Sequence, residues 1–329
     1  MTATSAPELR VEVDWGKDLP DLRAQDISDI TVDAADNVYL LYRSPSFVAV
    51  CTAGGAPLRT FGEGVLGPRA HGVTVAPDGR VLIVDSGSHR LLTFDPRGTL
   101  IDQFGSGPTN PAFQAWAGGN YIDHIDQAYP PFTLPTRVAV AGPEALFVSD
   151  GYGNCCVHHY AANGRLVSSW GEPGTRPGQF HTPHDIYVDR SERILVCDRE
   201  NDRIQVFDQS GSWLEQWTDL HRPQGAVEGP DGLYYVAEGA WRPGHVSPVH
   251  GAVDPAPSRL SILTGDGTVV GRFGGEQPGT PGSFIAAHAI TVDSRGDVYV
   301  AEVAWSVSRN FPDYGVVNPV TVQKLIRSR

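Results

Sequence analysis

Apolar and polar positions alternate along this chain in a unit that recurs six times. Each unit has an apolar strand, a turn with Asp or Gly, a second strand ending in an acid, a third strand, and a fourth ending in Phe-Gly or Trp-Gly. The clearest copy runs from His71 to Gly105. Period-two alternation with β-branched residues predicts strands throughout, and no segment shows a convincing helical period. Such a repeat is typical of a β-propeller, in which each unit forms one blade.

The repeats predict an all-β, six-bladed propeller that forms a single domain over residues 1–329. The expected blades cover residues 28–62, 69–105, 135–171, 182–218, 223–274 and 286–326. The last repeat lacks a fourth strand, and the segment 9–16, which ends in Trp15-Gly16, is a candidate for it. Pairing of this N-terminal segment with the last blade would close the ring and protect its strand edges.

Three segments interrupt the repeats, and all three carry aromatic residues. They are residues 106–134, 239–257 and 303–317, with Trp116, Tyr121, Tyr129, Trp241, Trp305, Phe311 and Tyr314. Loops of this length in a compact domain are uncommon and often functional. Two roles stay open for these rings: they form a lid or wall over a site, or they only pack the loops down.

Histidine occupies one register position in every second repeat. The innermost strands of the successive repeats begin at Ser28, His71, Thr136, His184, Gln224 and His288. Six blades are spaced about 60° apart, so alternate blades lie about 120° apart and three imidazoles at one height would converge. This pattern predicts a three-histidine metal site with an open position. The donor set favours Zn²⁺, with iron, copper, nickel or cobalt as alternatives, and matches Ca²⁺ poorly.

Residues that follow the second strands return to the face that holds the histidines. Arg43 and Arg199 share this position in repeats one and four, and Tyr152 lies one residue further on in repeat three. An arginine can hold a carboxylate with two hydrogen bonds, and a tyrosine beside a metal and an arginine can act as a base. Ordinary ion pairing with neighbouring acids is the alternative role for the two arginines.

An acid ends the second strand in five of the six repeats. A feature present in nearly every blade indicates an architectural role, such as pairing with Arg90 or Arg203 five residues further on. Asp185, directly after His184, is a candidate partner for that histidine.

Composition excludes several classes of partner. The formal net charge is −13, and an acidic chain repels phosphate backbones, so we expect no nucleic-acid partner. No run of about 20 apolar residues occurs, so we expect no membrane span. No export signal is visible and the four cysteines form no CxxC motif, so we expect a cytoplasmic protein with reduced thiols. The expected partner is a small-molecule substrate, and the oligomeric state stays open.

These residues give the chain a family resemblance. From about Ser28 to Ile326 it resembles the NHL-repeat propellers and, within them, the peptidyl-α-hydroxyglycine α-amidating lyase family. The segments that carry the resemblance are HGVTV (71–75), VSDGYGN (148–154), WGE (170–172), RPGQF (176–180), PHDI (183–186) and VCDREN (196–201).

The resemblance implies a zinc lyase whose metal ligands are His71, His184 and His288. It implies Tyr152 as the catalytic tyrosine and Arg199 and Arg43 as active-site arginines. In that chemistry zinc binds the hydroxyl of a carbinolamide, Tyr152 as a phenolate helps to take its proton, and C–N cleavage gives an amide and an aldehyde without redox change.

Two positions and one general feature differ from the family pattern. Gly153 stands at the family's cysteine position, and Ala289 stands where the family has a calcium-binding Asp. The family's proteins are secretory and disulfide-bonded, whereas no export signal is visible here. A calcium site therefore stays open, and a small hydroxylated metabolite is a candidate substrate in place of a peptide.

Three functions follow from these observations. The first is a metal-dependent lyase that cleaves a hydroxylated small molecule or a carbinolamide at the three-histidine site. The second is a metal-dependent hydrolase or hydratase, in which water on the metal attacks the substrate. The third is a non-catalytic NHL interaction scaffold, against which the three histidines speak, because a scaffold needs no metal in its channel.

Overall fold

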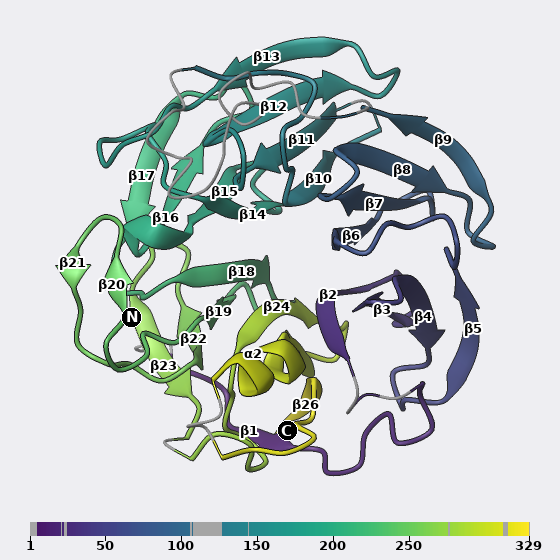
Figure 1. The fold of residues 1–329 in the computed structure, drawn as a ribbon, viewed down its shortest axis with the longest axis vertical. Helices are drawn as coiled ribbons and strands as arrows, with labels where there is room; N and C mark the ends of the chain where they lie inside the picture. The colour runs from purple at the N-terminus through teal and green to yellow at the C-terminus, as the bar shows by residue number, and fades with distance from the viewer. Residues whose placement is uncertain are drawn as a thin grey trace.

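Six four-stranded antiparallel sheets stand in a ring around a central channel (Figure 1). The computed structural model describes residues 5–20, 22, 25–105, 107, 127–143, 145–275, 277–311 and 315–328. The first three sheets, from the innermost strand outward, are β2 (Asp26–Val32), β3 (Val38–Arg43), β4 (Phe47–Cys51) and β5 (Pro57–Phe61); β6 (Ala70–Val75), β7 (Val81–Asp85), β8 (Arg90–Phe94) and β9 (Leu100–Phe104); and β10 (Arg137–Ala141), β11 (Ala145–Asp150), β12 (Cys156–Ala161) and β13 (Leu166–Trp170).

The other three sheets repeat this order. They are β14 (Pro183–Val188), β15 (Ile194–Asp198), β16 (Arg203–Phe207) and β17 (Trp213–Trp217); β18 (Pro223–Glu228), β19 (Tyr234–Glu238), β22 (Arg259–Leu263) and β23 (Val269–Phe273); and β24 (Ala287–Val292), β25 (Val298–Glu302), β26 (Val322–Arg327) and β1 (Leu9–Val11). The all-β, six-bladed architecture predicted from the repeats is therefore confirmed.

Burial falls from the second strand of each blade to the fourth. Every residue of β7, β15, β19 and β25 is buried, because neighbouring blades cover both faces of these strands. Strand β9, at the rim, is exposed along most of its length. This gradient explains why the second strands are nearly continuous apolar runs while the fourth strands contain more polar residues.

The N-terminal strand β1 supplies the fourth strand of the last blade. Leu9 lies opposite Arg327 and Val11 lies opposite Leu325 in an antiparallel pair with β26. The strand is shorter than the expected segment 9–16, because Trp15 and Gly16 lie in a turn. There the Trp15 indole packs against Tyr299 at 5.3 Å between ring centroids and donates to the Ala53 carbonyl at 3.0 Å.

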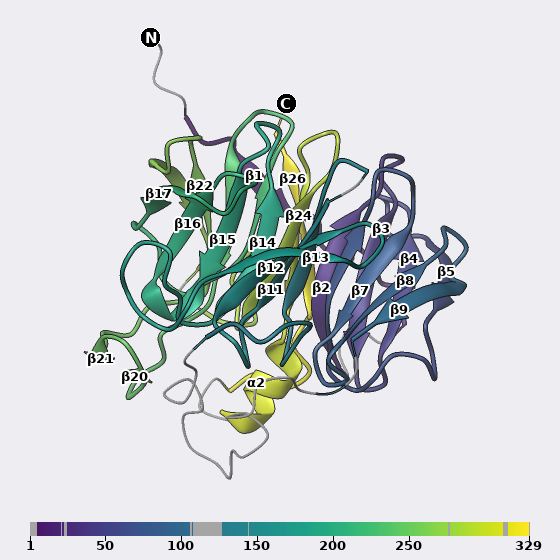
Figure 2. The ribbon, with the colours of Figure 1, turned by 90° about the horizontal axis from the view of Figure 1, so that it is seen from above.

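The expectation of an all-strand chain was wrong in the insertions. Helix α2 (Ala304–Asn310) lies within the segment 303–317, and a short 3₁₀ turn, η2 (Arg199–Asn201), follows β15. The insertion after β19 forms a small hairpin, β20 (Val246–Ser247) with β21 (Gly251–Ala252). Seven residues of helix are too few for a hydrophobic period to stand out. Figure 2 shows α2 and this hairpin on one face of the ring, and strand β1 toward the other.

The acids that end the second strands have the architectural role expected of them. Asp85 accepts the Gly67 amide at 2.9 Å and lies 3.4 Å from Arg90. Asp198 accepts the His181 amide at 2.7 Å and pairs with Arg203 at 2.9 Å. In each case the carboxylate holds the chain that enters the innermost strand of its own blade. These contacts satisfy backbone donors that would otherwise be buried without partners.

Membrane insertion through a helix has no support in the described residues. The helices in the described part of the chain are too short and too polar to cross a bilayer. All four cysteines are buried and free of disulfide bonds.

Glu302 should give the protein a stability that falls as pH rises. Its carboxylate accepts the Ile285 amide at 2.8 Å and the Gln323 side-chain amide at 3.0 Å, but burial raises its pKa from 4.5 to about 7. The folded state therefore keeps this proton to a higher pH than the unfolded chain. Its contribution to the free energy of unfolding must fall between about pH 4.5 and 7, by on the order of 3 kcal/mol.

Urea unfolding of wild type and Glu302→Gln across pH 4.5–7.5 measures this contribution. The variant should lose the pH-dependent fall, so its unfolding free energy should rise relative to that of wild type by on the order of 3 kcal/mol between about pH 4.5 and 7. Glu63→Gln, which removes an exposed carboxylate, is the matched control. A constant difference between wild type and Glu302→Gln at every pH would contradict the assignment.

Candidate metal centre and active site

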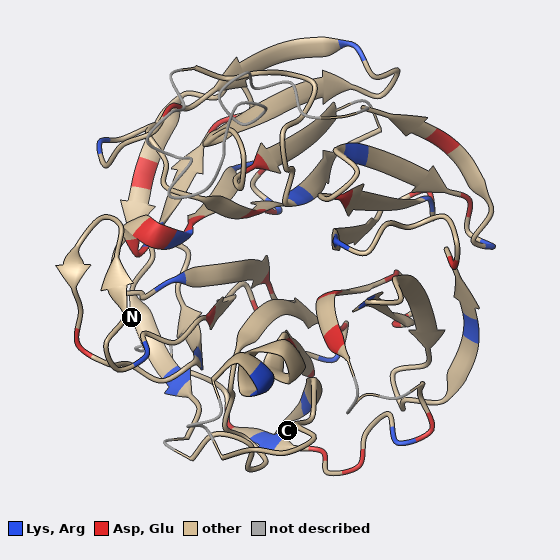
Figure 3. Cartoon of the chain, viewed as in Figure 1, with Lys and Arg blue, Asp and Glu red and all other residues tan. Residues whose placement is uncertain are grey.

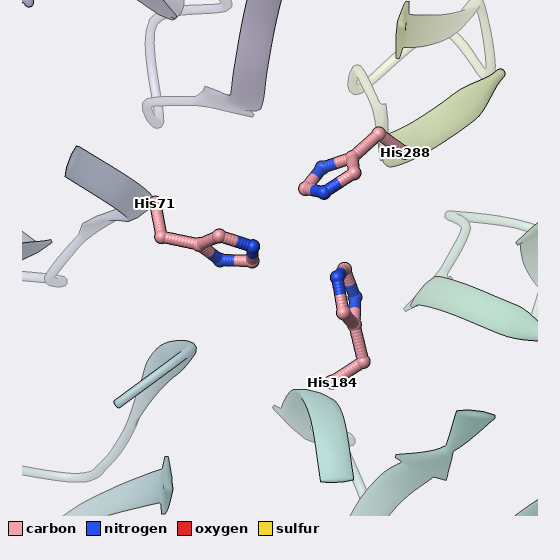
Figure 4. A group of neighbouring side chains, drawn as sticks. All are labelled: His71, His184 and His288. Carbon is pink, nitrogen blue, oxygen red and sulfur yellow. The ribbon is translucent and has the colours of Figure 1, made fainter. Parts of the chain in front are cut away.

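His71, His184 and His288 come together at the centre of the channel, as the sequence register predicted. One ring nitrogen of each lies within 4.8 Å of the others, and the ring centroids are 4.7–4.9 Å apart. Figure 4 shows the three rings converging from three different blades. All three side chains are buried.

A β-bulge places each histidine. The pairing between the first and second strands shifts register across His71, across His184 and across His288. The bulged residue has no partner in the ladder, so its side chain can turn from the sheet toward the axis. The same shift occurs across Ser28 and Gln224 in the blades without histidine.

Hydrogen bonds from blade to blade fix the orientation of each imidazole. His71 Nδ1 lies 2.8 Å from the Thr136 carbonyl oxygen, His184 Nδ1 lies 2.7 Å from that of Gln224, and His288 Nδ1 lies 2.7 Å from that of Ser28. A carbonyl oxygen only accepts, so each Nδ1 carries the hydrogen and each Nε2 keeps a lone pair. The blades without histidine thus orient the histidines of the blades before them.

The three rings are held neutral. Burial lowers the pKa of all three histidines. Repulsion from a second protonated imidazole, that of His288, further lowers the pKa of His71 and His184, and the charge of Arg43 further lowers that of His288. The pKa of His288 falls to about 3. Neutral imidazole is the form that coordinates a metal, so the site is ready for a cation throughout the physiological pH range.

The donor set fits a divalent transition metal. Three Nε2 lone pairs face one another, and among the described residues the hydroxyl that contacts them is Tyr152 Oη, at 3.1 Å from His71 Nε2 and 2.8 Å from His184 Nε2. A single O–H hydrogen can satisfy only one of these nitrogens. Buried acceptors in excess of donors are costly unless a cation joins them, and three imidazoles suit Zn²⁺.

Tyr152 reaches the histidines because two glycines flank it. It follows β11, whose last residue, Asp150, accepts the backbone amides of Thr133 and Leu134 at 2.6 and 2.9 Å. A Cβ on Gly151 would lie 2.1 Å from the Pro183 carbonyl oxygen, and one on Gly153 would lie 2.5 Å from the Thr133 side chain. The loop can pass close to its neighbours only without these side chains, so Gly153 leaves no space for the family's cysteine.

Arg199 lies against Tyr152 and is held by an acid. Its Nη1 is 3.4 Å from Tyr152 Oη, and its guanidinium carbon is 5.5 Å from the centre of the tyrosine ring. Its Nε pairs with Glu200 at 2.7 Å, and Arg222 pairs with the same carboxylate at 2.8 Å. Burial opposes these charges, yet the Glu200 carboxylate raises the pKa of Arg199, and the two arginines lower the pKa of Glu200 to about 2.

Arg43 faces the same centre, and none of the acids among the described residues forms an ion pair with it. It ends β3, and its charge acts on His71, His288 and Tyr152. Among the described residues, its buried Nε has no hydrogen-bond partner. Burial lowers its pKa, with Tyr152 and Asp26 opposing that shift. A buried donor without a partner is available to a ligand in the channel.

Sequence reasoning missed a buried ionic group that lies next to the three histidines. Arg137 Nη1 donates to Asp29, and its Nε lies 3.6 Å from Asp185. Burial raises the pKa of both carboxyl groups, and the guanidinium opposes that rise. The shared register of Arg137 with Asp29 and Asp185, one residue after the histidine position, was the signal in the sequence.

This ionic group corrects the role expected of Asp185 and argues against a calcium site. Asp185 does not bind the His184 ring: it accepts the Ala226 amide at 2.9 Å and faces Arg137. The positive charge between Asp29 and Asp185 comes from the Arg137 guanidinium, and Ala289, which offers no carboxylate, lies beside them. These residues hold an internal cation, and the donor set does not fit Ca²⁺.

Three aromatic residues of the insertions lie against arginines. Arg309 lies 4.7 Å from the Trp305 ring centre, and Arg242 lies 3.5 Å from that of Phe311. The Trp241 ring lies 4.9 Å from Arg222. The expected lid residues Trp116, Tyr121 and Tyr314, with most of the segment 106–134, lie outside the described residues.

Comparison with known proteins confirms the predicted resemblance. The NHL repeat model matches residues 68–94 and 180–207. The chain is 34% identical over 143 residues to the peptidylglycine alpha-amidating monooxygenase of Rattus norvegicus, which covers 42% of this chain and 13% of the rat protein. The peptidyl-alpha-hydroxyglycine alpha-amidating lyase 1 of Drosophila melanogaster is 27% identical over 79% of this chain and 47% of its own length.

Other matches extend along more of the chain. NHL repeat-containing protein 3 of Mus musculus is 27% identical over 90% of this chain and 82% of the mouse protein. Among solved structures, a streptogramin B lyase has a TM-score of 0.56 at 14% identity and covers 98% of each chain. That structural likeness is one of fold. The chain thus carries NHL repeats and resembles the amidating lyases, although it spans a small part of the rat relative and about half of the fly one.

Loss of one imidazole should empty the metal site. His184→Ala removes one of three ligands, so metal bound at one equivalent in the wild type should fall well below stoichiometric occupancy after dialysis. Elemental analysis of the purified protein measures this. His250→Ala, which changes a histidine in the exposed hairpin, is the control and should keep full occupancy. Full occupancy in His184→Ala would rule out the three-ligand site.

Replacing Arg137 should lower the free energy of unfolding more than replacing a surface arginine does. Arg137→Met leaves Asp29 and Asp185 buried without a cation, and removing one partner of a buried pair costs about 3–5 kcal/mol. Arg295→Met, which breaks an ion pair with Asp293 from a half-exposed side chain, should cost at most about 1 kcal/mol. Denaturant unfolding of both variants at neutral pH tests the difference, and equal losses would contradict it.

Proposed function

We propose that this protein is a metal-dependent lyase that cleaves a hydroxylated small molecule of the carbinolamide type at the three-histidine site. The observation that carries the proposal is the position of Tyr152 Oη, in hydrogen-bond contact with two of the metal-binding nitrogens and with Arg199. The names of the rat and fly relatives support a lyase of this class.

His71, His184 and His288 would hold the metal through their Nε2 atoms. Zn²⁺ is the ion that this donor set suits best. When bound, it would supply a Lewis acid that polarises an oxygen of the substrate.

Tyr152 is the residue placed to move a proton. It is half-buried at the mouth of the channel, so its hydroxyl can meet a substrate beside the histidines. In a carbinolamide, the hydroxyl proton passes to Tyr152 Oη while the oxygen electron pair forms the new C=O bond. The C–N bond breaks, and the nitrogen takes the bonding pair and then a proton from Tyr152. The products are an amide and an aldehyde, so no electron acceptor is needed.

The two arginines would bind and orient the substrate. Arg199 is fixed by Glu200 and stays charged beside Tyr152, where its Nη1 can donate a hydrogen bond to Tyr152 Oη or to an oxygen of the substrate. Arg43 has an unpaired buried Nε on the opposite side of the channel, which suits a carboxylate or carbonyl oxygen of the substrate. A substrate with an anionic end would therefore meet complementary charge on both sides.

Tyr152→Phe should separate catalysis from metal binding. The variant keeps the ring and loses the hydroxyl, so cleavage of an N-acyl α-hydroxyglycine should fall by about 10²–10⁴-fold while bound metal stays stoichiometric. Amide release by chromatography and elemental analysis give the two readouts. Tyr235→Phe, whose hydroxyl binds Asp231 away from the channel, is the matched control.

The outcome also separates the lyase from a hydrolase or hydratase. A lyase forms its aldehyde oxygen from the substrate hydroxyl, so the aldehyde formed in H₂¹⁸O and reduced at once to the alcohol with borohydride should lack the label. Label incorporated during turnover, or full activity in Tyr152→Phe, would overturn the proposed mechanism.

A further inference from the structure

A large apolar pocket lies on the same face as the metal centre and has no role so far. Its volume is about 740 Å³, within the range of small-molecule sites. Trp241, Phe284 and Phe311 contribute rings, and Val246, Ile285 and four prolines complete the apolar wall. Its wall comes from three segments: the insertion after β19, the chain that enters β24, and the end of helix α2. All three connect at the face where the second strands end, which is the face of the histidines.

A continuous set of contacts joins this pocket to the metal centre. The Arg222 guanidinium lies over the Trp241 ring of the pocket wall at 4.9 Å. Arg222 pairs with Glu200, Glu200 pairs with Arg199, and Arg199 reaches Tyr152 Oη. Two ion pairs, Arg222 with Glu200 and Glu200 with Arg199, therefore connect the pocket wall to the candidate catalytic tyrosine.

The pocket also offers a polar group that has no partner. His245 lines it, and its Nδ1 is buried without a hydrogen-bond partner among the described residues. Arg242 lies against Phe311 on the same wall, so its charge borders the pocket. An apolar cavity with one or two unpaired polar groups is built for a ligand that is mainly apolar and carries a hydrogen-bonding atom.

We propose that this pocket binds a bulky apolar arm, aromatic or branched aliphatic, on the acyl side of the substrate cleaved at the metal centre. This inference rests on the proposed function and narrows it to a substrate class. The carbinolamide and its anionic end lie between the histidines, Arg199 and Arg43. The acyl arm extends past Arg222 onto Trp241 and Phe311, with its carbonyl or a ring heteroatom near His245. A small acyl group leaves the pocket to water.

The test compares two substrates that differ only in the acyl arm, N-acetyl-α-hydroxyglycine and N-(2-naphthoyl)-α-hydroxyglycine. The metal-loaded wild type should prefer the naphthoyl compound in kcat/KM by at least about tenfold, mainly through KM. Phe311→Ala and Val246→Asp should reduce that preference to within about threefold. Val246 is 66% exposed, so Val246→Asp puts a charge at the rim with little cost to folding.

Val13→Asp is the matched control, because Val13 has the same exposure of 66% and does not line this pocket. It should keep the wild-type preference. Equal kcat/KM for the two substrates in the wild type, or an unchanged preference in both pocket variants, would overturn the pocket assignment while turnover of the acetyl compound upholds the lyase.

Binding without chemistry keeps the two proposals separate. Calorimetry of metal-loaded protein with N-(2-naphthoyl)glycine and N-acetylglycine, which lack the hydroxyl, should show at least about tenfold tighter binding of the naphthoyl compound. Val246→Asp should remove that difference and Val13→Asp should keep it. If neither hydroxylated substrate is cleaved, the lyase fails, and this measurement alone decides the pocket: equal affinities in the wild type would refute it.

Discussion

The hydrogen bond from each channel histidine to a carbonyl of the next blade is the contact on which the metal centre depends. In each case one blade turns an imidazole inward at a bulge and the next blade presents a carbonyl oxygen; that next blade has the same bulge at Ser28 and Gln224 but pairs regularly after Thr136. His71 with Thr136, His184 with Gln224 and His288 with Ser28 repeat this arrangement around the axis. Because Nδ1 is occupied, only Nε2 is free to point at the centre. Every histidine ligand thus needs a neighbouring blade to orient it, so the metal centre depends on the whole ring of blades.

The charges around this centre are arranged in two groups with different tasks. On one side, Arg137 is enclosed by Asp29 and Asp185, and these carboxylates also hold backbone amides of following blades. On the other side, Arg43 and Arg199 face the histidines. Among the described residues, Arg199 pairs with Glu200, and the Nε of Arg43 has no hydrogen-bond partner. Figure 3 shows basic and acidic segments together along the border of the channel, in a chain whose net charge is −13. Two arginines beside the histidines of an acidic protein favour a small anionic ligand over a large polyanion.

The repeats made the fold and the three histidines predictable from the sequence. Features that depart from the repeat pattern could not be predicted in this way. The blade pattern and the histidine register follow from short-range alternation and a fixed repeat, so strands and His71, His184 and His288 could be placed. The partner of Asp185 could not, because it depends on which of several acids Arg137 reaches across the axis. Helix α2 was missed because one short turn in an insertion has no period to detect. Trp15 was assigned to a strand because its Trp-Gly pair looks like a blade end, but it packs in a turn on Tyr299.

The two sides of the centre differ in the room that they offer a substrate. The space lined by the histidines and Arg137 has a volume of about 10 Å³, at the lower limit for one water molecule. A substrate is therefore better accommodated at the face where the second strands end. The insertions after β19 and β25 both rise from that face, whereas the turns of the opposite face are short and polar. Blades five and six can consequently change what the mouth admits without disturbing the bulges and carbonyls that hold the three histidines.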